Sequence, residues 1–144
     1  MINIETEIAQ AVSELRIPPE EFARCDTEKS VAVIKTTKRN YVSGSPVVWW
    51  FALRHVVERR HFPDGGFRHI SDYIPASDKD CWFIPELHEA YPLVYEAQIS
   101  QLECVIGNCI GFAYYIVGKD YGWLLAESDS DELFFSVYDP AATS

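Results

Sequence analysis

Residues 93–138 constrain the fold of this chain most strongly, because their pattern changes from strand to helix and back to strand. Residues 93–96 are apolar and β-prone, and across residues 99–109 apolar side chains recur at the three- and four-residue spacing of a helix face. Three β-branched and aromatic runs follow, separated by turn-rich segments, at residues 112–117, 123–126 and 133–137. The pattern predicts a strand, a helix and then a β-meander.

The N-terminal segment predicts an amphipathic helix and a strand. Apolar residues recur at helical spacing across residues 4–15, and two prolines at residues 18–19 end this helix. Residues 20–23 can add one further helical turn. The compact apolar run at residues 31–34 predicts a strand, and the polar, basic residues 35–40 predict a loop or the exposed end of a hairpin.

The middle of the chain predicts a second helix and a turn. Ser45 and Pro46 suit a helix start, since serine caps free amides and proline is tolerated at the first helical position. We therefore expect a helix over residues 47–60, with a strand opening at residues 47–51 as the alternative. Pro-Asp-Gly-Gly at residues 63–66 is the strongest turn signal of the chain.

The order of these segments predicts the fold class. The apolar run at residues 81–84, closed by a proline, predicts one more strand in the core or at a sheet edge. No repeat or linker divides the chain. We expect a single α+β domain over residues 1–144, one layer pair with a mostly antiparallel sheet that ends in the C-terminal β-meander, and with helices packed on one face.

The net charge of −10 is unevenly distributed along the chain. Residues 1–34 carry seven acids and three bases, residues 35–69 two acids and seven bases, and residues 70–144 thirteen acids and two bases. A nucleic-acid binder shows a basic excess over a whole face, so we expect no nucleic-acid partner. An acidic surface suits a basic protein partner, because long-range attraction accelerates encounter; solubility alone is the alternative explanation.

Composition and cysteine spacing also bear on location and cofactor use. No apolar run approaches the roughly 20 residues of a membrane-spanning helix, and the first residues lack the pattern of a signal peptide. We therefore expect a cytoplasmic location and no membrane partner. The four cysteines include no CxxC pair, so we expect reduced, structural thiols, no metal and no cofactor. The four are Cys25, Cys81, Cys104 and Cys109.

Residues 54–69 hold the candidate groups for catalysis. His55, His61 and His69 lie close in sequence, but none pair at the i, i+4 spacing of a helical zinc site. With the neighbouring arginines they could form a hydrolase or phosphate-ester site if they converge in one pocket. Such convergence defines the alternative hypothesis, a small enzyme.

An acidic turn is the second candidate site. Residues 128–132 place three acids between two predicted strands, and the ligand pattern of an EF-hand calcium loop is broken by the residues that follow. The turn is either a solvated hairpin tip or a patch that faces a partner. The partner-binding residues that we predict are Tyr121, Glu127, Asp129, Asp131 and Glu132.

Three segments resemble a small bacterial family of unknown function. They are Cys-Trp-Phe-Ile-Pro-Glu at residues 81–86, Leu-Val-Tyr-Glu at residues 93–96, and Tyr-Tyr-Ile-Val-Gly-Lys-Asp-Tyr-Gly-Trp-Leu-Leu-Ala-Glu at residues 114–127. In that family a histidine-rich polar pair follows the last segment, whereas Ser128 and Asp129 stand here. In layout the chain is also loosely similar to SUKH-type immunity proteins, which are α+β proteins that neutralise secreted bacterial toxins.

These observations lead to one main hypothesis. We expect a non-catalytic protein-binding domain, an immunity protein that neutralises a basic toxin domain through an acidic, aromatic surface, because acids steer encounter and rings anchor interfaces. The toxin partner is implied by the SUKH-type resemblance alone. The alternative is the enzyme built on the histidines and arginines of residues 54–69, and a self-assembling structural subunit is a third possibility.

Overall fold

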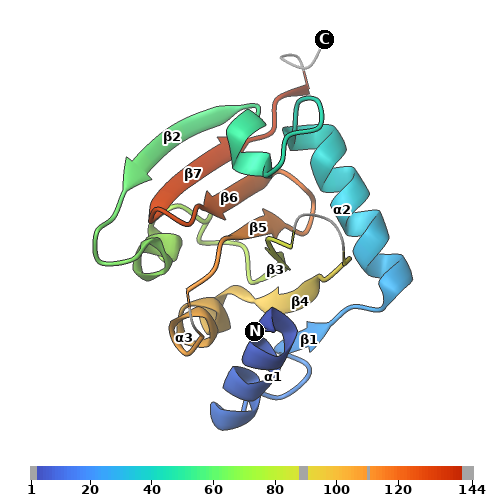
Figure 1. Cartoon of the computed structure of the whole chain (residues 1–144), viewed down its shortest axis with the longest axis vertical. Helices are drawn as coiled ribbons and strands as arrows, with labels where there is room; N and C mark the ends of the chain where they lie inside the picture. Colours follow the sequence, from blue (N-terminus) through green and yellow to red (C-terminus); the bar gives the residue numbers. More distant parts are fainter. Residues whose placement is uncertain (1–2, 88–90, 110, 141–144) are drawn as a thin grey trace.

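The computed structural model describes residues 3–87, 91–109 and 111–140. In that part of the chain three α-helices, three short 3₁₀ helices (η) and seven strands follow one another (Figure 1). Their bounds are α1 (Ile4–Glu14), β1 (Phe22–Arg24), α2 (Thr27–Tyr41), η1 (Trp49–Ala52), β2 (Val56–His61), η2 (Gly66–Asp72), β3 (Asp80–Pro85), β4 (Tyr95–Gln98), η3 (Ile99–Gln101), α3 (Leu102–Gly107), β5 (Tyr114–Gly118), β6 (Trp123–Glu127) and β7 (Glu132–Val137).

The strands form one sheet in the order β1-β4-β3-β5-β6-β7-β2, and every neighbouring pair is antiparallel. The register places Pro85 of β3 opposite Tyr114 of β5, and Tyr114 opposite Glu127 of β6. These three residues therefore mark one end of the sheet. The α+β class, the antiparallel sheet and the C-terminal meander β5-β6-β7 are confirmed.

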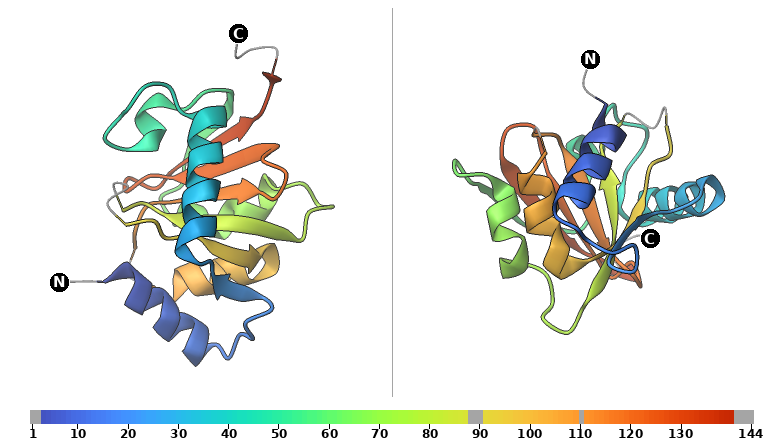
Figure 2. Two further views of the ribbon diagram at one scale, coloured as in Figure 1. Left: turned by 90° about the vertical axis from the view of Figure 1, so that its right-hand side faces the viewer. Right: turned by 90° about the horizontal axis from the view of Figure 1, so that it is seen from below.

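Both faces of the sheet are covered, which corrects the expectation that helices pack on one face only. Every residue of β5 and of β6 is buried, so side chains on both sides of these strands need a covering layer. Ile116 and Leu125 join a cluster with α1, α3 and η2, whereas Val117 and Leu124 join a cluster with α2 and η1. Figure 2 shows α2 on one side of the sheet and the other two α-helices on the opposite side.

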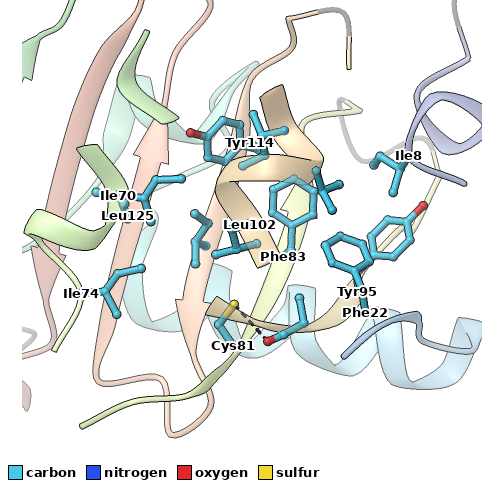
Figure 3. Close-up of a cluster of buried hydrophobic side chains, with 14 of the residues drawn as sticks. Ile8, Phe22, Ile70, Ile74, Cys81, Phe83, Tyr95, Leu102, Tyr114 and Leu125 are labelled. Atoms are coloured by element: carbon cyan, nitrogen blue, oxygen red, sulfur yellow. Dashed lines mark hydrogen bonds between the residues drawn. The ribbon is translucent and has the colours of Figure 1, made fainter. Parts of the chain in front are cut away.

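The cluster under α1 and α3 is rich in aromatic rings. Phe83 of β3 is fully buried, and its ring centroid lies 5.5 Å from that of Tyr114 and 6.0 Å from that of Phe22. Figure 3 shows Ile8 of α1 and Leu102 of α3 among these side chains. The packing joins strands from the middle and the β1 edge of the sheet to both helices.

The segment from residue 27 to residue 41 is one helix, so the predicted strand at residues 31–34 and the loop at residues 35–40 are wrong. The Asp26 carboxylate caps the helix by accepting a 2.7 Å hydrogen bond from the Lys29 N–H. Val33 is buried, but its neighbour Val31 remains 49% exposed. Of the apolar run, Val33 and the partly buried Ile34 therefore pack towards the sheet, and Val31 does not.

The predicted helix over residues 47–60 is also wrong, and so is the alternative strand at residues 47–51. The chain forms the short helix η1 and then strand β2, which pairs with β7 at the edge of the sheet. Trp49 alone of the aromatic run is buried, where its ring packs 4.5 Å from Tyr115. Because β2 has an available partner in β7, its β-branched start favours a strand over a helix.

Other local predictions fare better. The predicted N-terminal helix matches α1, the helix within residues 99–109 matches η3 and α3, and the run at residues 81–84 lies within β3. β3 is an interior strand. Gly65 has a φ of 101°, as the predicted turn requires. The helical turn considered at residues 20–23 is wrong, because β1 begins there and pairs with β4.

We expect Phe83→Ala to lower the free energy of unfolding by about 3–5 kcal/mol, because it leaves a cavity in the aromatic cluster. Phe51→Ala is the matched control, since this ring is 72% exposed and its loss should change stability by less than about 0.5 kcal/mol. Urea unfolding followed by circular dichroism measures both. Equal effects of the two substitutions would contradict the packing described above.

Candidate functional site

The β6–β7 connection gathers four of the five predicted partner-binding residues at one end of the sheet. β6 ends at Glu127, β7 begins at Glu132, and Asp129 and Asp131 lie in the turn between them. Asp131 has a φ of 60°, a left-handed conformation that aspartate adopts more readily than most residues. We call residues 127–132 the acidic hairpin.

Glu127 anchors the acidic hairpin inside the protein. Glu127 is only 5% exposed, and its Oε2 accepts a 2.7 Å hydrogen bond from the Gly66 N–H. A Cβ at position 66 would lie 2.7 Å from that oxygen, so the close approach requires glycine. Burial raises the pKa of the Glu127 carboxyl, and the nearby Tyr114 hydroxyl and Gly66 N–H oppose part of the rise.

The other three acids lie outside this buried contact. Glu132 accepts two hydrogen bonds from the Arg59 guanidinium, at 2.7 and 3.1 Å, and this pairing lowers the pKa of its carboxyl. Asp129 and Asp131 are exposed. Neither forms an ion pair with any residue that the structure describes. Two carboxylates of the acidic hairpin are thus directed to solvent without a cation beside them.

A groove of about 710 Å³ lies between the acidic hairpin and the segment around η1. The η1 side contributes the most exposed large apolar side chains of the described chain, with Val47 74% and Phe51 72% exposed. Asp129 and Glu132 line the same groove from the acidic hairpin, together with Arg59. We call the η1 side of the groove the apolar lip, which consists of Val47, Trp50 and Phe51.

The apolar lip is fixed to the sheet through Tyr115 of β5. The Tyr115 hydroxyl accepts a 3.0 Å hydrogen bond from the Trp49 N–H and donates one of 2.7 Å to Glu86 Oε1. Burial and the bond to Glu86 raise the pKa of Tyr115, so this hydroxyl keeps its proton near neutral pH. The exposed ring of Phe51 therefore projects from a segment whose preceding residues are held in place.

A second hollow, of about 270 Å³, lies on the other face of the sheet beside the acidic hairpin. Glu127, Asp129 and the Phe67 ring line it, as does Cys109. Burial raises the pKa of the Cys109 thiol to about 11, so this thiol is protonated near neutral pH and is a poor nucleophile. Asp129 lines both hollows, which makes the acidic hairpin the wall between them.

Tyr121 lies apart from the other predicted partner-binding residues. It sits in the turn between β5 and β6, with a φ of 62°, and its carbonyl accepts a 2.7 Å hydrogen bond from the Tyr41 hydroxyl. The length of β6 separates it from Glu127. The structure thus brings Asp129, Asp131 and Glu132 together at the surface, buries Glu127 beneath them, and places Tyr121 at the opposite end of the sheet.

The histidines of residues 54–69 do not converge in one pocket. His55 precedes β2 and its ring packs edge-on against Tyr138, whereas His61 is the last residue of the same strand. His69 stacks 3.9 Å from the Phe62 ring and bonds to Asp64. Two of the arginines lie away from His69: Arg54 donates to the Arg39 carbonyl, and Arg59 binds Glu132. The other two share contacts with His69, because Arg60 lies over the Phe62 ring and Arg68 donates to the Asp64 carbonyl.

The described residues offer no metal centre, reactive thiol pair or membrane-spanning helix. No group of three histidine, cysteine, aspartate or glutamate side chains there could hold a metal ion. The four cysteines are free thiols, and burial raises the pKa of Cys81, whose Sγ lies 3.5 Å from the Ala97 carbonyl oxygen (Figure 3). Within the described chain, no helix has the length and apolar character needed to cross a membrane.

The fold and the groove define an α+β protein whose antiparallel sheet presents an apolar lip and an acidic hairpin at one end. The chain belongs to DUF6756, a family of unknown function, whose model matches residues 1–140. The expectation of an uncharacterised family is thereby confirmed, whereas no comparison shows the similarity to SUKH-type immunity proteins. No curated protein and no solved structure matches the chain significantly.

The apolar lip was missed by reasoning from the sequence. The apolar run Val-Val-Trp-Trp-Phe at residues 47–51 falls in the predicted helix over residues 47–60, or in the alternative strand, whereas the structure buries Val48 and Trp49 and exposes Val47 and Phe51. The signal was the length of the run. Five consecutive large apolar residues cannot all face one side of a helix or a strand, so some are exposed where only one side is covered, as Val47 and Phe51 are here.

Glu127→Gln tests the buried carboxyl. Because the pKa of Glu127 is raised in the folded state, the folded protein holds this proton more tightly than the unfolded chain does. The free energy of unfolding therefore falls as pH rises from the ordinary glutamate pKa, about 4.3, through the folded-state value. Glutamine still accepts from Gly66 and carries no charge. The stability of Glu127→Gln relative to the wild type should therefore increase with pH across this window and stay constant above it.

Urea unfolding at a series of pH values from about 4 to 8 measures this difference. Glu103→Gln is the matched control, because Glu103 is exposed on α3. A stability difference that stays constant with pH, or that moves in the opposite direction, would contradict the buried-carboxyl assignment.

Proposed function

We propose that this protein is a non-catalytic protein-binding domain whose groove takes a basic segment of a partner protein. One observation carries the proposal: the most exposed large apolar residues of the described chain, Val47 and Phe51, line the same groove as the carboxylates of Asp129 and Glu132. Grouped exposed apolar residues beside polar ones are typical of interaction sites. The geometry of the histidines gives no comparable support to the enzyme hypothesis.

The chemistry of the groove indicates what the partner segment contains. The apolar lip offers Trp50 and Phe51 as anchors, and aromatic anchors contribute a large share of the free energy at interfaces. The exposed Asp129 carboxylate offers a contact for arginine or lysine. A partner segment with a cationic side chain next to an apolar one satisfies both sides of the groove.

The charge of the whole molecule supports a basic partner. The chain carries a net charge of −10, and thirteen of its 22 acids lie in residues 70–144, which include the acidic hairpin. Such a charge accelerates encounter with a basic protein and discourages encounter with an acidic one. The effect should weaken as salt concentration rises, because Asp129 and Asp131 of the hairpin are exposed.

The partner that we propose is a basic toxin domain, which makes this protein an immunity protein. A toxin that acts on nucleic acid needs a basic surface to hold phosphates. A protein that covers this surface with its own carboxylates prevents the toxin from binding its substrate, and it needs no catalytic group to do so. The acidic hairpin is the part of this chain that would occupy the basic surface.

Two substitutions in the groove separate the contributions of the apolar lip and the acidic hairpin. We expect Phe51→Ser to weaken binding of the basic partner about tenfold or more, mainly through faster dissociation, because it removes an anchor from a short-range contact. We expect Asp129→Lys to weaken binding mainly through slower association. The association rate of the wild type should fall as the salt concentration rises, and that of Asp129→Lys should fall less.

The measurement is biolayer interferometry with the basic protein that the wild-type chain retains from its native host. Val31→Ser is the control for Phe51→Ser, because Val31 is an exposed apolar residue on α2. Glu20→Lys is the control for Asp129→Lys, because Glu20 is exposed and lies outside the groove lining. Retention of no basic protein, or equal loss of binding in variants and controls, would contradict the proposal.

A further inference from the structure

Strand β2 is an open edge of the sheet. It pairs with β7 on one side, and no other described strand lies beyond it (Figure 1). All six of its residues are exposed. The opposite edge, β1, has only three residues. Because an edge strand presents unpaired N–H and C=O groups, β2 is the longer of two templates for pairing with another strand.

The register with β7 shows which way the charged side chains of β2 point. Glu58 lies opposite Phe135 and Arg60 opposite Leu133, and these two β7 residues pack with the α1 and α3 cluster. Residues directly opposite in a sheet share a face, so Glu58 and Arg60 point to the same side. Arg59 points to the groove side, where its guanidinium lies 5.1 Å from the Phe134 ring centroid.

These side chains make β2 complementary to itself. Two copies of a strand can pair antiparallel about a two-fold axis perpendicular to the sheet. Each residue then lies opposite a residue of the other copy whose number differs from its own by zero or an even number, and both side chains point to the same face. An axis at Arg59 places Glu58 of each copy opposite Arg60 of the other, which gives two opposite-charge pairs. An axis at Glu58 or at Arg60 also places the axial residue opposite its own copy, but it forms no opposite-charge pair.

We propose that two copies of this chain associate through β2, paired antiparallel about a two-fold axis at Arg59, into one continuous sheet. Arg59 meets its own copy at the axis, but each Arg59 already binds Glu132 of its own chain. The register shift between Val56 and Glu58 lies at the start of β2 and leaves residues 58–61 in regular register with β7. The proposal does not depend on the groove.

Charges and irregularities along an edge usually prevent pairing with other sheets, and they explain why the expected association is selective. A foreign strand without alternating acid and base cannot form the two charge pairs of the register at Arg59. A second copy supplies both. Two exposed pairs add little attraction, so we expect a dimer that forms with rising protein concentration and weakens with salt.

Sedimentation velocity over a concentration series tests the proposal. The wild type should shift from a mass of 16.5 kDa towards about twice that value as concentration rises. Glu58→Arg should remain a monomer, because the introduced arginine would face Arg60 of the second copy, and Arg60→Glu should remain a monomer for the converse reason. A mixture of these two variants should restore the dimer, since each then supplies the charge that the other lacks.

Two exposed residues outside β2 give matched controls: Glu20→Arg for Glu58→Arg, and Lys35→Glu for Arg60→Glu. Both controls should dimerise as the wild type does. A monomeric wild type at every concentration overturns the proposal, and so does a Glu58→Arg variant that dimerises as the wild type does. If circular dichroism shows that both variants are folded and their mixture stays monomeric, the proposed register is overturned as well.

Discussion

The burial of β5 and β6 on both sides is the constraint on which the rest of the structure depends. Each strand buries all five of its residues, so the two faces of the sheet need separate layers of covering side chains. α1, α3 and η2 supply one layer, and α2 with η1 supplies the other. The chain therefore folds its N-terminal half around a sheet whose centre is largely encoded in its C-terminal half.

This double burial also determines where surface chemistry can appear. The centre of the sheet is closed on both sides, so groups that contact a partner come from its ends and edges. At one end Glu127 bonds to Gly66 on one face, while Tyr115 holds Trp49 on the other. These two buried contacts fix the acidic hairpin and the apolar lip relative to the same strands, so the groove between them is preformed and loses little conformational entropy on binding.

The sequence predicted the meander well because β5, β6 and β7 are consecutive, and short turns join strands that are neighbours in the sheet. It failed at β2, whose partner β7 lies more than 70 residues away, as in the pairing of His61 with Glu132. It also failed at residues 31–34, where a helix cap at Asp26 outweighs a β-prone run. Of the candidate site, the acids of the hairpin were predicted from local composition, but the burial of Glu127 and the contribution of Phe51 depend on distant contacts.

The proposed function depends on the position of the partner at the groove between the apolar lip and the acidic hairpin. Site-specific photocrosslinking tests this position most directly, with a benzophenone amino acid placed at position 51 or, as the reference, at position 31 on α2. We expect the basic partner to be crosslinked efficiently from position 51 and not from position 31. Crosslinking from position 31 with none from position 51 would place the partner on α2 and contradict the proposed function.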